Sequence, residues 1–269
     1  MIFVQHINMK GIIGAISGDI IGSTREFNSI KTKDFNLFTK KSTFTDDTIM
    51  TLAIANWLIK DKVSKRVLVD ELKYWGNKYP NAGYGGMFNN WLKQDSPQAY
   101  GSWANGSAMR VSPCAWVGES IEEVQNLAYK SSVVTHNHPE GIKGALATAD
   151  AIYLARIGAK KQEIKDHIEV RYQYDLDSKL DDIRPYYDFD VSCAGSVPES
   201  IICFLEAKNF EDAIRNAVSL GGDADTQAAI AGSIASAYWD VPNGIAFRAI
   251  HRLDYDLLRV FIDFDEKFM

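Results

Sequence analysis

Hydrophobic residues recur at helical spacing along most of this chain. Residues 49–59 form an almost continuous apolar segment, too apolar for a surface helix and long enough to favour a buried helix over a strand. Residues 140–156 mix Gly and Ala with Ile, Leu and Tyr, and Gly158 then offers a plausible C-terminal stop, which predicts a second core helix. The same periodicity predicts helices over 67–75, 121–129, 197–207, 210–220, 226–238 and 254–268.

The alternating pattern of a half-buried strand does not occur in the sequence. Val133–Thr135 is a short β-branched cluster, but an isolated triplet is more often part of a loop or a helix. The sequence also shows no repeat, no low-complexity tract and no Pro/Ser-rich linker at which a domain boundary would fall. We therefore predict an all-α fold in which residues 1–269 form a single domain, a helical bundle with polar motifs at its helix ends.

Composition and charge narrow the choice of partners. The 29 basic and 35 acidic residues give a formal net charge of −6, which provides no basic surface for a nucleic-acid backbone. Cys114, Cys193 and Cys203 lack CxxC spacing and are predicted to be buried thiols in a reducing compartment, so we expect a cytoplasmic protein. No apolar run approaches the roughly 20 residues that span a bilayer. His6 and Asn8 interrupt the apolar stretch that an export signal needs, so we expect no membrane partner.

Two acidic motifs stand at the starts of predicted buried helices. Thr45-Asp46-Asp47-Thr48 precedes the helix over 49–59, and Asp223-Ala224-Asp225-Thr226 opens the helix over 226–238. Helix capping explains either motif taken alone, because Asp and Thr oxygens accept hydrogen bonds from first-turn amides. Four aspartates exceed what capping requires, and they would repel one another without a counter-ion. Hard oxygen donors without a Cys/His set favour Mg²⁺ or Mn²⁺ over zinc, provided that the motifs meet in space.

Other polar motifs have two interpretations each. Asn105-Gly106-Ser107 precedes the apolar stretch 108–117, so it is either a plain capped helix start or a helix N-terminus whose amides bind a diphosphate. Arg110 in that stretch is expected to pair with a carboxylate or a phosphate. His138-Pro139-Glu140 has the pattern of an N-cap, an N1 proline and an acid favoured by the helix dipole. His6, His167 and His251 show no functional pattern.

Five motifs occur in an order that resembles the ADP-ribosylglycohydrolase family, which includes the dinitrogenase reductase-activating glycohydrolases and short bacterial members. They are Gly18-Asp19-Ile20-Ile21-Gly22 with Glu26, Phe44 to Thr48, Asn105 to Arg110, Thr135 to Gly141, and Gly221 to Thr226. Each motif is weak by itself, but the order of all five, spread over most of the chain, is specific. Ala224 stands where relatives often have Ser, which removes a hydroxyl and leaves both neighbouring carboxylates.

The resemblance implies an orthogonal helical bundle with two Mg²⁺ or Mn²⁺ ions. The positions that match the family's metal ligands are Thr45, Asp46, Asp47, Asp223, Asp225 and Thr226. Asp46 and Asp225 are also expected to be catalytic, together with Glu26, whose alternative is a solvated acid after a helix. Asp19 is expected to brace the metal site from behind.

The resemblance and the residue types together give a set of residues expected to bind substrate. These are Asn105, Gly106, Ser107, Met109, His136, Tyr84, Gly221 and Gly222. Gly221 and Gly222 allow an unusual turn and a close approach to a ligand. His136 is either a substrate contact or a satisfied buried histidine. Tyr84 and Trp103 are candidates for stacking on adenine, although such aromatic rings more often pack in a core.

The implied function is hydrolysis of the N- or O-glycosidic bond that joins ADP-ribose to a modified protein side chain or a small molecule. Nucleic acid enters only as a modified substrate. Two alternatives stay open: a catalytically silent, crystallin-like binding or structural protein, and a two-metal hydrolase of free ADP-ribose derivatives. The sequence specifies neither the leaving group nor the oligomeric state, and we expect leaving-group contacts from the acidic, tyrosine-containing loop over 174–192.

Overall fold

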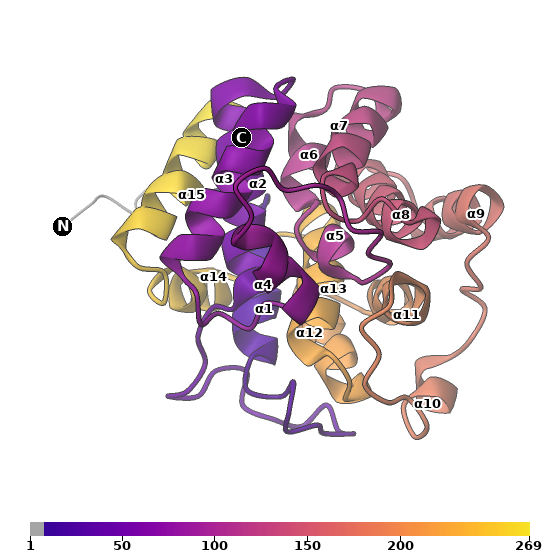
Figure 1. The fold of residues 1–269 in the computed structure, drawn as a ribbon. Helices are drawn as coiled ribbons and strands as arrows, with labels where there is room; N and C mark the ends of the chain where they lie inside the picture. Colours follow the sequence, from indigo (N-terminus) through magenta and orange to yellow (C-terminus); the bar gives the residue numbers. More distant parts are fainter. Residues whose placement is uncertain (1–7) are drawn as a thin grey trace.

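The computed structural model describes residues 8–269, and these residues form helices joined by loops (Figure 1). Their helices are α1 (Ile13–Gly22), α2 (Asp46–Asp61), α3 (Lys65–Lys78), α4 (Gly86–Leu92), α5 (Gly106–Met109), α6 (Ser112–Val117), α7 (Ile121–Val133), α8 (Pro139–Arg156), α9 (Lys161–Tyr172), α10 (Leu180–Ile183), α11 (Cys193–Glu206), α12 (Phe210–Leu220), α13 (Ala224–Tyr238), α14 (Asn243–Ile250) and α15 (Tyr255–Phe268). Within this part of the chain, β-pairing is limited to one isolated bridge between Ala104 and Ser192. The predicted all-α fold is confirmed.

Most helices predicted from periodicity are present, and the differences have local causes. The stretch 108–117 was expected to be one helix but is divided between α5 and α6. Pro113 lies in the first turn of α6, where its missing N–H is tolerated, whereas in the middle of a longer helix it would remove a hydrogen bond. The expected loop over 174–192 contains one helical turn, α10. Helices α4, α9 and α14 were not predicted.

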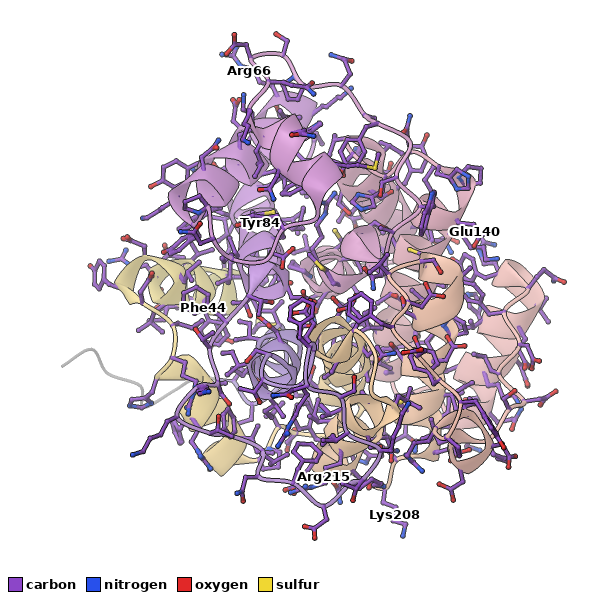
Figure 2. The ribbon with its side chains drawn as sticks, turned by 60° about the horizontal axis from the view of Figure 1, so that its bottom comes forward. Phe44, Arg66, Tyr84, Glu140, Lys208 and Arg215 are labelled. Carbon is purple, nitrogen blue, oxygen red and sulfur yellow. The ribbon has the colours of Figure 1, made fainter. Side chains whose placement is uncertain are left out.

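Two central helices, α1 and α13, pack unusually closely because α1 carries glycine at every fourth position. Every residue of α1 is buried. A Cβ atom added at Gly18 would lie 2.0 Å from the Ala228 carbonyl oxygen, and one added at Gly14 would lie 2.3 Å from the Gly232 oxygen. The backbones therefore touch along one face, as glycine allows. The two helices run side by side at the centre of the molecule in both views (Figures 1 and 2).

This packing fixes where the ends of the two helices lie. A Cβ atom on Gly22, the last residue of α1, would lie 2.4 Å from the Ala224 oxygen and 2.5 Å from the Asp225 Cα atom. The C-terminal end of α1 therefore contacts the N-terminal end of α13. Asp19 and Glu26 are consequently placed near Asp225, although nearly the whole chain separates them in sequence.

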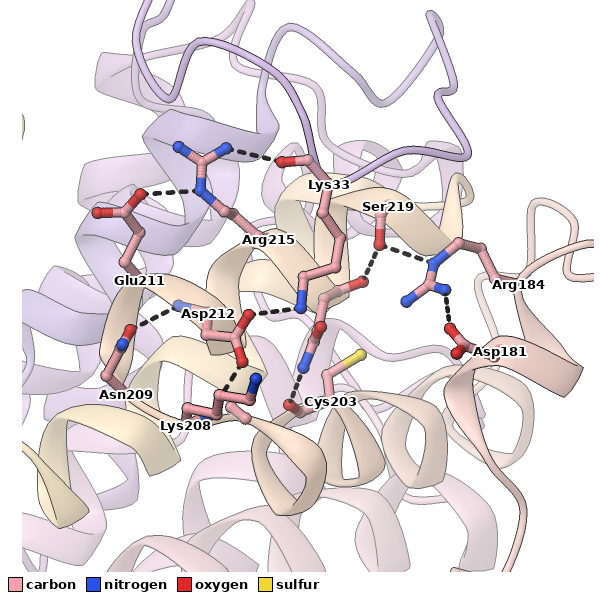
Figure 3. Close-up of polar contacts among 12 residues, drawn as sticks. Lys33, Asp181, Arg184, Cys203, Lys208, Asn209, Glu211, Asp212, Arg215 and Ser219 are labelled. Carbon is pink, nitrogen blue, oxygen red and sulfur yellow. Dashed lines mark hydrogen bonds and ion pairs between the residues drawn. The ribbon is translucent and has the colours of Figure 1, made fainter.

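The segment 23–45, which links α1 to α2, is held against the helical core by side chains of other elements. Arg215 of α12 donates through Nη1 to the carbonyl oxygens of Lys33 and Phe35, each at 2.8 Å. Lys33 in turn forms an ion pair with Asp212 of α12 (Figure 3). Arg252 donates to the Ser42 carbonyl oxygen at 3.0 Å. A segment without regular structure is thus held in its middle and near its C-terminal end.

Three further sequence-based expectations bear on the described residues. Cys114, Cys193 and Cys203 are free and buried, as predicted. None of the helices between residues 8 and 269 is long and apolar enough to cross a membrane. His6 lies outside the described residues, as does most of the stretch considered for an export signal. The single-domain organisation and the cytoplasmic location stay predictions.

Candidate active site

The first acidic motif does not use its aspartates as helix caps. Thr45 is the N-cap of α2, and its side-chain oxygen accepts a hydrogen bond from the Asp47 amide at 3.3 Å. Because Thr45 performs the capping, the carboxylates of Asp46 and Asp47 in the first turn are left for other contacts. Capping therefore does not account for this motif.

The second acidic motif behaves in the same way. Asp223 occupies the N-cap position of α13 but makes no side-chain capping bond. Its Oδ2 atom instead accepts a hydrogen bond from Asn105 Nδ2 at 2.7 Å. Asp225 Oδ1 accepts from the amide of the next residue, Thr226, at 3.0 Å. Asn105 likewise makes no capping bond for α5, so its amide serves the acidic motif rather than its own helix.

The fold brings the two acidic motifs together. Oxygen atoms of Glu26, Asp223 and Asp225 all lie within 4.8 Å of one another. Thr226 Oγ1 donates to Asp47 Oδ2 at 3.2 Å, which joins the start of α13 to the start of α2. Glu26 therefore lies beside the acids at the start of α13, and the start of α2 adjoins them through Asp47.

Asp19 lies behind this cluster and holds the start of α2 against α1. Its two carboxylate oxygens accept hydrogen bonds from the Thr45 amide at 3.0 Å, the Thr45 hydroxyl at 2.7 Å and the Thr48 amide at 3.1 Å. The Thr48 hydroxyl donates to it as well. The carboxylate is fully buried, so these bonds replace its hydration. This arrangement agrees with the bracing role expected for Asp19.

The clustered acids have raised pKa values because they are buried beside one another. Burial raises the pKa of Asp46, Asp47 and Asp225 well above the usual range of a carboxyl group, and neighbouring carboxylates raise it further. Burial also raises the pKa of Asp223, against the lowering effect of the bond from Asn105. Within residues 8–269, no Lys, Arg or His forms an ion pair with any of these acids. The described part of the chain therefore gives the cluster no counter-charge.

This chemistry fits a divalent cation. Asp47 Oδ1 is buried without a hydrogen-bond partner, a costly state for a carboxylate oxygen that a bound cation would relieve. All donors of the cluster are carboxylate or hydroxyl oxygens, the ligands that Mg²⁺ and Mn²⁺ prefer. The residues present therefore suit a hard metal ion.

Glu26 occupies the half-buried edge of the cluster. Burial is the main reason that its pKa rises to about 7, and the charges of Asp223 and Asp19 add to the shift. A hydrogen bond with Asp225 acts in the opposite direction. A carboxyl group with this pKa exchanges a proton near neutral pH, as acid-base catalysis requires.

A cavity of about 300 Å³ opens over the cluster. Its acidic wall includes Glu26, Asp46, Asp47, Asp223 and Asp225. The other walls are formed by residues of the segment 100–110, His136, the glycine-rich turn 83–88, and Phe189 with Val191. This volume is within the usual range for a small-molecule site.

Some of the other residues predicted to bind substrate line the cavity, and the rest are buried away from it. Asn105, Gly106, Met109 and His136 line the cavity, whereas Ser107 is buried beneath it and donates to the Gly141 carbonyl oxygen at 2.6 Å. Tyr84 is 6% exposed and packs against Phe88, and it is not part of the cavity wall, which its neighbours Gly83, Gly85 and Gly86 form instead. Tyr84 is visible in Figure 2.

The two glycines before Asp223 have a conformational role in this arrangement. Gly221 has a φ of +66° and ends α12 in the left-handed conformation that glycine tolerates. A Cβ atom on Gly222 would lie 2.6 Å from a ring carbon of Tyr187. Neither glycine lines the cavity. They bring the chain out of α12 and into position for the acids of α13.

His136 and Arg110 line another part of the cavity. A Cβ atom on Gly106 would lie 3.0 Å from His136 Nε2, so a glycine is needed where the ring approaches. His136 Nδ1 shares a hydrogen bond with Thr135 Oγ1 at 2.7 Å, and burial lowers the pKa of the ring well below its usual value. The Arg110 guanidinium is buried and donates to Thr135 Oγ1 at 2.7 Å and to the Ser131 carbonyl oxygen at 2.8 Å. Within residues 8–269 it pairs with no carboxylate.

His138 has the structural role predicted for it. Its Nδ1 accepts a hydrogen bond from the Glu140 amide at 3.1 Å, and Pro139 is the first residue of α8. The predicted N-cap, N1 proline and first-turn acid are therefore all confirmed.

The aromatic edge of the cavity was not predicted from the sequence motifs. Phe189 and Val191 belong to the loop over 174–192 and line the cavity. The Phe189 ring stacks on the exposed Phe27 ring with a centroid separation of 6.1 Å. The sequence placed Phe189 and Val191 in a loop that was expected to contact the leaving group. It did not distinguish them from the other residues of that loop.

The fold and the site define an all-helical protein with a buried cluster of acids suited to divalent cations, set in a small-molecule cavity. Residues 9–264 match the family described as ADP-ribosylglycohydrolase, and the chain belongs to this family. The predicted class of enzyme, a glycosidic-bond hydrolase, is thereby confirmed.

Two individual relatives and one solved structure are similar to this chain. The chain is similar to the mouse (Mus musculus) protein named ADP-ribosylhydrolase ARH3, with 29% identity over 73% of this chain and 69% of the relative. It is also similar to the ADP-ribosylarginine hydrolase Tri1 of Pseudomonas putida (strain GB-1), with 26% identity over 86% of this chain and 70% of the relative. A solved structure, titled ADP-ribosylglycohydrolase-related protein complex, has the same fold, with a TM-score of 0.72, 20% identity and 97% coverage of both chains.

Proposed function

We propose that this protein is a hydrolase that depends on two divalent cations, Mg²⁺ or Mn²⁺, and removes ADP-ribose from an N- or O-linked acceptor. The single observation that carries the proposal is the convergence of acids from residues 26, 46–47 and 223–225 on one cavity without a basic partner. The residues that would hold the ions are Thr45, Asp46, Asp47, Asp223, Asp225 and Thr226. When bound, such ions supply Lewis-acid chemistry beside the ribose.

The protein's own residues account for the remaining requirements. The reaction breaks the bond between the ribose anomeric carbon and the acceptor N or O atom, and water supplies a hydroxyl to the carbon and a proton to the acceptor. Glu26, whose pKa is raised to about 7, is positioned to transfer that proton. The surrounding carboxylates stabilise positive charge that develops on the ribose.

The cavity walls formed by residues other than the acids would bind the rest of the ADP-ribose group. The amides around Gly106 and the neutral imidazole of His136 offer hydrogen bonds to the phosphates and the second ribose. The exposed aromatic residues Trp103 and Phe189 offer flat faces for adenine or for the leaving group. The names of the two relatives support a substrate in which ADP-ribose is attached to another group.

The test is a panel of substrates that carry ADP-ribose on arginine, serine, acetate or a nucleobase, each assayed with Mg²⁺, with Mn²⁺ and with a chelator. We expect release of intact ADP-ribose from at least one substrate, and loss of this release in chelator. Release of AMP or phosphate would instead favour a hydrolase of free ADP-ribose derivatives. Full activity after removal of metal would contradict the proposed mechanism, and inactivity on every substrate with metal bound would favour a silent binding protein.

A further inference from the structure

A chain of hydrogen bonds runs from Arg110 through Thr135 to the ring of His136. Arg110 Nη2 donates to Thr135 Oγ1 at 2.7 Å, and the same oxygen lies 2.7 Å from His136 Nδ1. Nη2 also donates to the Ser131 carbonyl oxygen at 2.8 Å, which anchors the guanidinium group to the last turn of α7. Arg110 is 1% exposed, so most of its side chain is out of reach of a ligand.

This chain determines where the hydrogen atom of the Thr135 hydroxyl lies. A guanidinium group has only N–H donors, so Thr135 Oγ1 must accept the bond from Arg110. The hydroxyl has one hydrogen to donate, and two acceptors are near it: the Ser132 carbonyl oxygen at 3.4 Å and His136 Nδ1 at 2.7 Å. Bonds donated by a hydroxyl are usually about 2.5–3.0 Å long, which the first contact exceeds. The hydrogen therefore points at His136 Nδ1.

A ring nitrogen that accepts a hydrogen bond carries no hydrogen of its own. His136 is uncharged at neutral pH, because burial and the charge of Arg110 both lower the pKa of the ring well below its usual value. A neutral imidazole has one N–H group, which must then be at Nε2. Nε2 makes no hydrogen bond within residues 8–269, and it is not among the buried atoms of that range that lack a partner. It therefore reaches the surface of the cavity that His136 lines.

The surroundings of the ring keep this N–H group in one direction. The His136 amide donates to the Ser132 carbonyl oxygen at 2.8 Å, and the Tyr100 ring packs beside the imidazole with a centroid separation of 6.0 Å. A Cβ atom on Gly141 would lie 3.1 Å from the His136 Cβ atom. Gly106, by contrast, leaves the Nε2 edge uncovered because it has no side chain. The ring is thus held firmly while Nε2 stays open to a ligand.

We propose that Arg110 and Thr135 are positioning residues that hold His136 as the Nε2–H tautomer, so that His136 donates a hydrogen bond to an oxygen atom of the ADP-ribosyl group. The part that concerns the ligand rests on the proposed function. The position of the hydrogen does not, because it follows from contacts inside the protein. In this tautomer the nitrogen that faces the cavity cannot accept a proton, which excludes His136 as a general base and leaves acid-base chemistry to Glu26.

The first experiment detects the hydrogen directly. Long-range proton–nitrogen correlation spectra of the full-length protein, with isotope-labelled histidine and bound Mg²⁺, distinguish a protonated ring nitrogen from an unprotonated one. They are recorded at about pH 8, above the usual pKa of histidine. We expect a protonated Nε2 and an unprotonated Nδ1 for His136. His251 gives the opposite reference, because its Nδ1 lies 2.7 Å from the Phe247 carbonyl oxygen, which can only accept.

Two variants of His136 identify its signals and test the contact with ligand. Asparagine places a polar atom near the position of Nδ1 and none at Nε2, whereas glutamine extends to the position of Nε2. Calorimetry with ADP-ribose and Mg²⁺ should show at least about tenfold weaker binding by His136→Asn, the usual scale for a hydrogen bond to a charged group. His136→Gln should recover part of this loss.

Three further variants test the positioning residues. Thr135→Val keeps the shape of the side chain without its hydroxyl, and Arg110→Met removes the donor that restrains the hydroxyl. We expect the His136 signals of both to show a mixture of tautomers. Thr135→Ser keeps Oγ1 and should keep the single tautomer and the parent affinity for ADP-ribose. Circular dichroism confirms that each variant is folded, and the two Thr135 variants decide the result if Arg110→Met is not.

Several outcomes would overturn the proposal. One is a parent protein in which His136 Nδ1 is protonated, alone or together with Nε2. Another is a single Nε2–H tautomer in both Thr135→Val and Arg110→Met, which would show that these residues do not set it. Parent-like binding of ADP-ribose by His136→Asn would exclude the contact with ligand. If the parent itself does not bind ADP-ribose, the proposed function fails together with that contact, whereas the spectra alone decide the position of the hydrogen.

Discussion

Replacing Gly18 by alanine tests whether the contact between α1 and α13 holds the acidic cluster together. The added Cβ atom would lie 2.0 Å from the Ala228 carbonyl oxygen and 2.4 Å from its carbonyl carbon. Ordinary contact begins at 3.4 Å, so the two helices would have to separate locally by about 1.4 Å. Both contacts are with backbone atoms, which cannot rotate away as a side chain does.

The expected cost follows from two opposing effects. Alanine is favoured over glycine in a helix by about 0.8–1.0 kcal/mol. Overpacking a close interface costs about 1–3 kcal/mol and more where neighbours cannot move. Because both contacts are with backbone atoms, the upper end of that cost applies, and we expect Gly18→Ala to lose about 2 kcal/mol net. This loss lowers the Tm of a chain of this size by roughly 4–8 °C. Activity should fall as well, because Asp19 and Glu26 move with α1.

Gly244→Ala is the matched control. Gly244 lies in α14, and a Cβ atom added there would have no neighbour within 4 Å. The same substitution should therefore leave activity unchanged and leave the Tm equal or slightly higher. Thermal unfolding and turnover are measured for both variants. Equal Tm values and equal turnover would refute the view that backbone contact at Gly18 sets the geometry of the site.

Three other predictions concern the site. Asp225→Asn should lower kcat by roughly a thousandfold or more, because it removes a carboxylate from the cluster, while circular dichroism stays that of the parent; near-normal turnover would contradict the assignment. In the presence of chelator, the free energy of unfolding of the parent protein, relative to that of Asp225→Asn, should fall as pH rises from 5 to 8. The reason is that the acids have raised pKa values in the folded state, which therefore binds more protons than the unfolded state does. Denaturant titration at each pH measures this difference, and a rise with pH would contradict the prediction. Trp103→Ala should raise KM about three- to tenfold with little change in kcat, because the half-exposed ring lines the cavity; an unchanged KM would show that the ring does not touch substrate.

The strongly apolar helices were predictable from the sequence, and the weakly patterned ones were not. The segments of α2 and α8 bury small and apolar residues over several turns, and their composition alone distinguished them. Helix α9 presents mostly charged side chains and buries only Ile164, Ile168 and Tyr172, so its periodic signal is weak. The division between α5 and α6 depends on Pro113, a local signal that the apolar run concealed.

The chemistry of the site was predictable as a set of residue types, but its arrangement was not. The acids of residues 45–48 and 223–226 were recognisable because they exceed what capping requires. Their convergence depends on the contact of α1 with α13. The spacing of glycines in α1 indicates that another helix packs closely against it, but not which helix. Ser107 was assigned to substrate because it belongs to a motif, and Tyr84 because its ring could stack on adenine. Packing decides in which direction such side chains point, and it directs both away from the cavity.

The acidic cluster combines residues that are far apart in the sequence, which has a consequence for biosynthesis. Residues 26 and 46–47 leave the ribosome well before residues 223–225. A growing or truncated polypeptide that lacks residues 223–225 therefore has only part of the acidic cluster, and it has no α13 to enclose that part. Under the proposed function, tight retention of a divalent cation would then be a chemical sign that both segments have been made and have folded together.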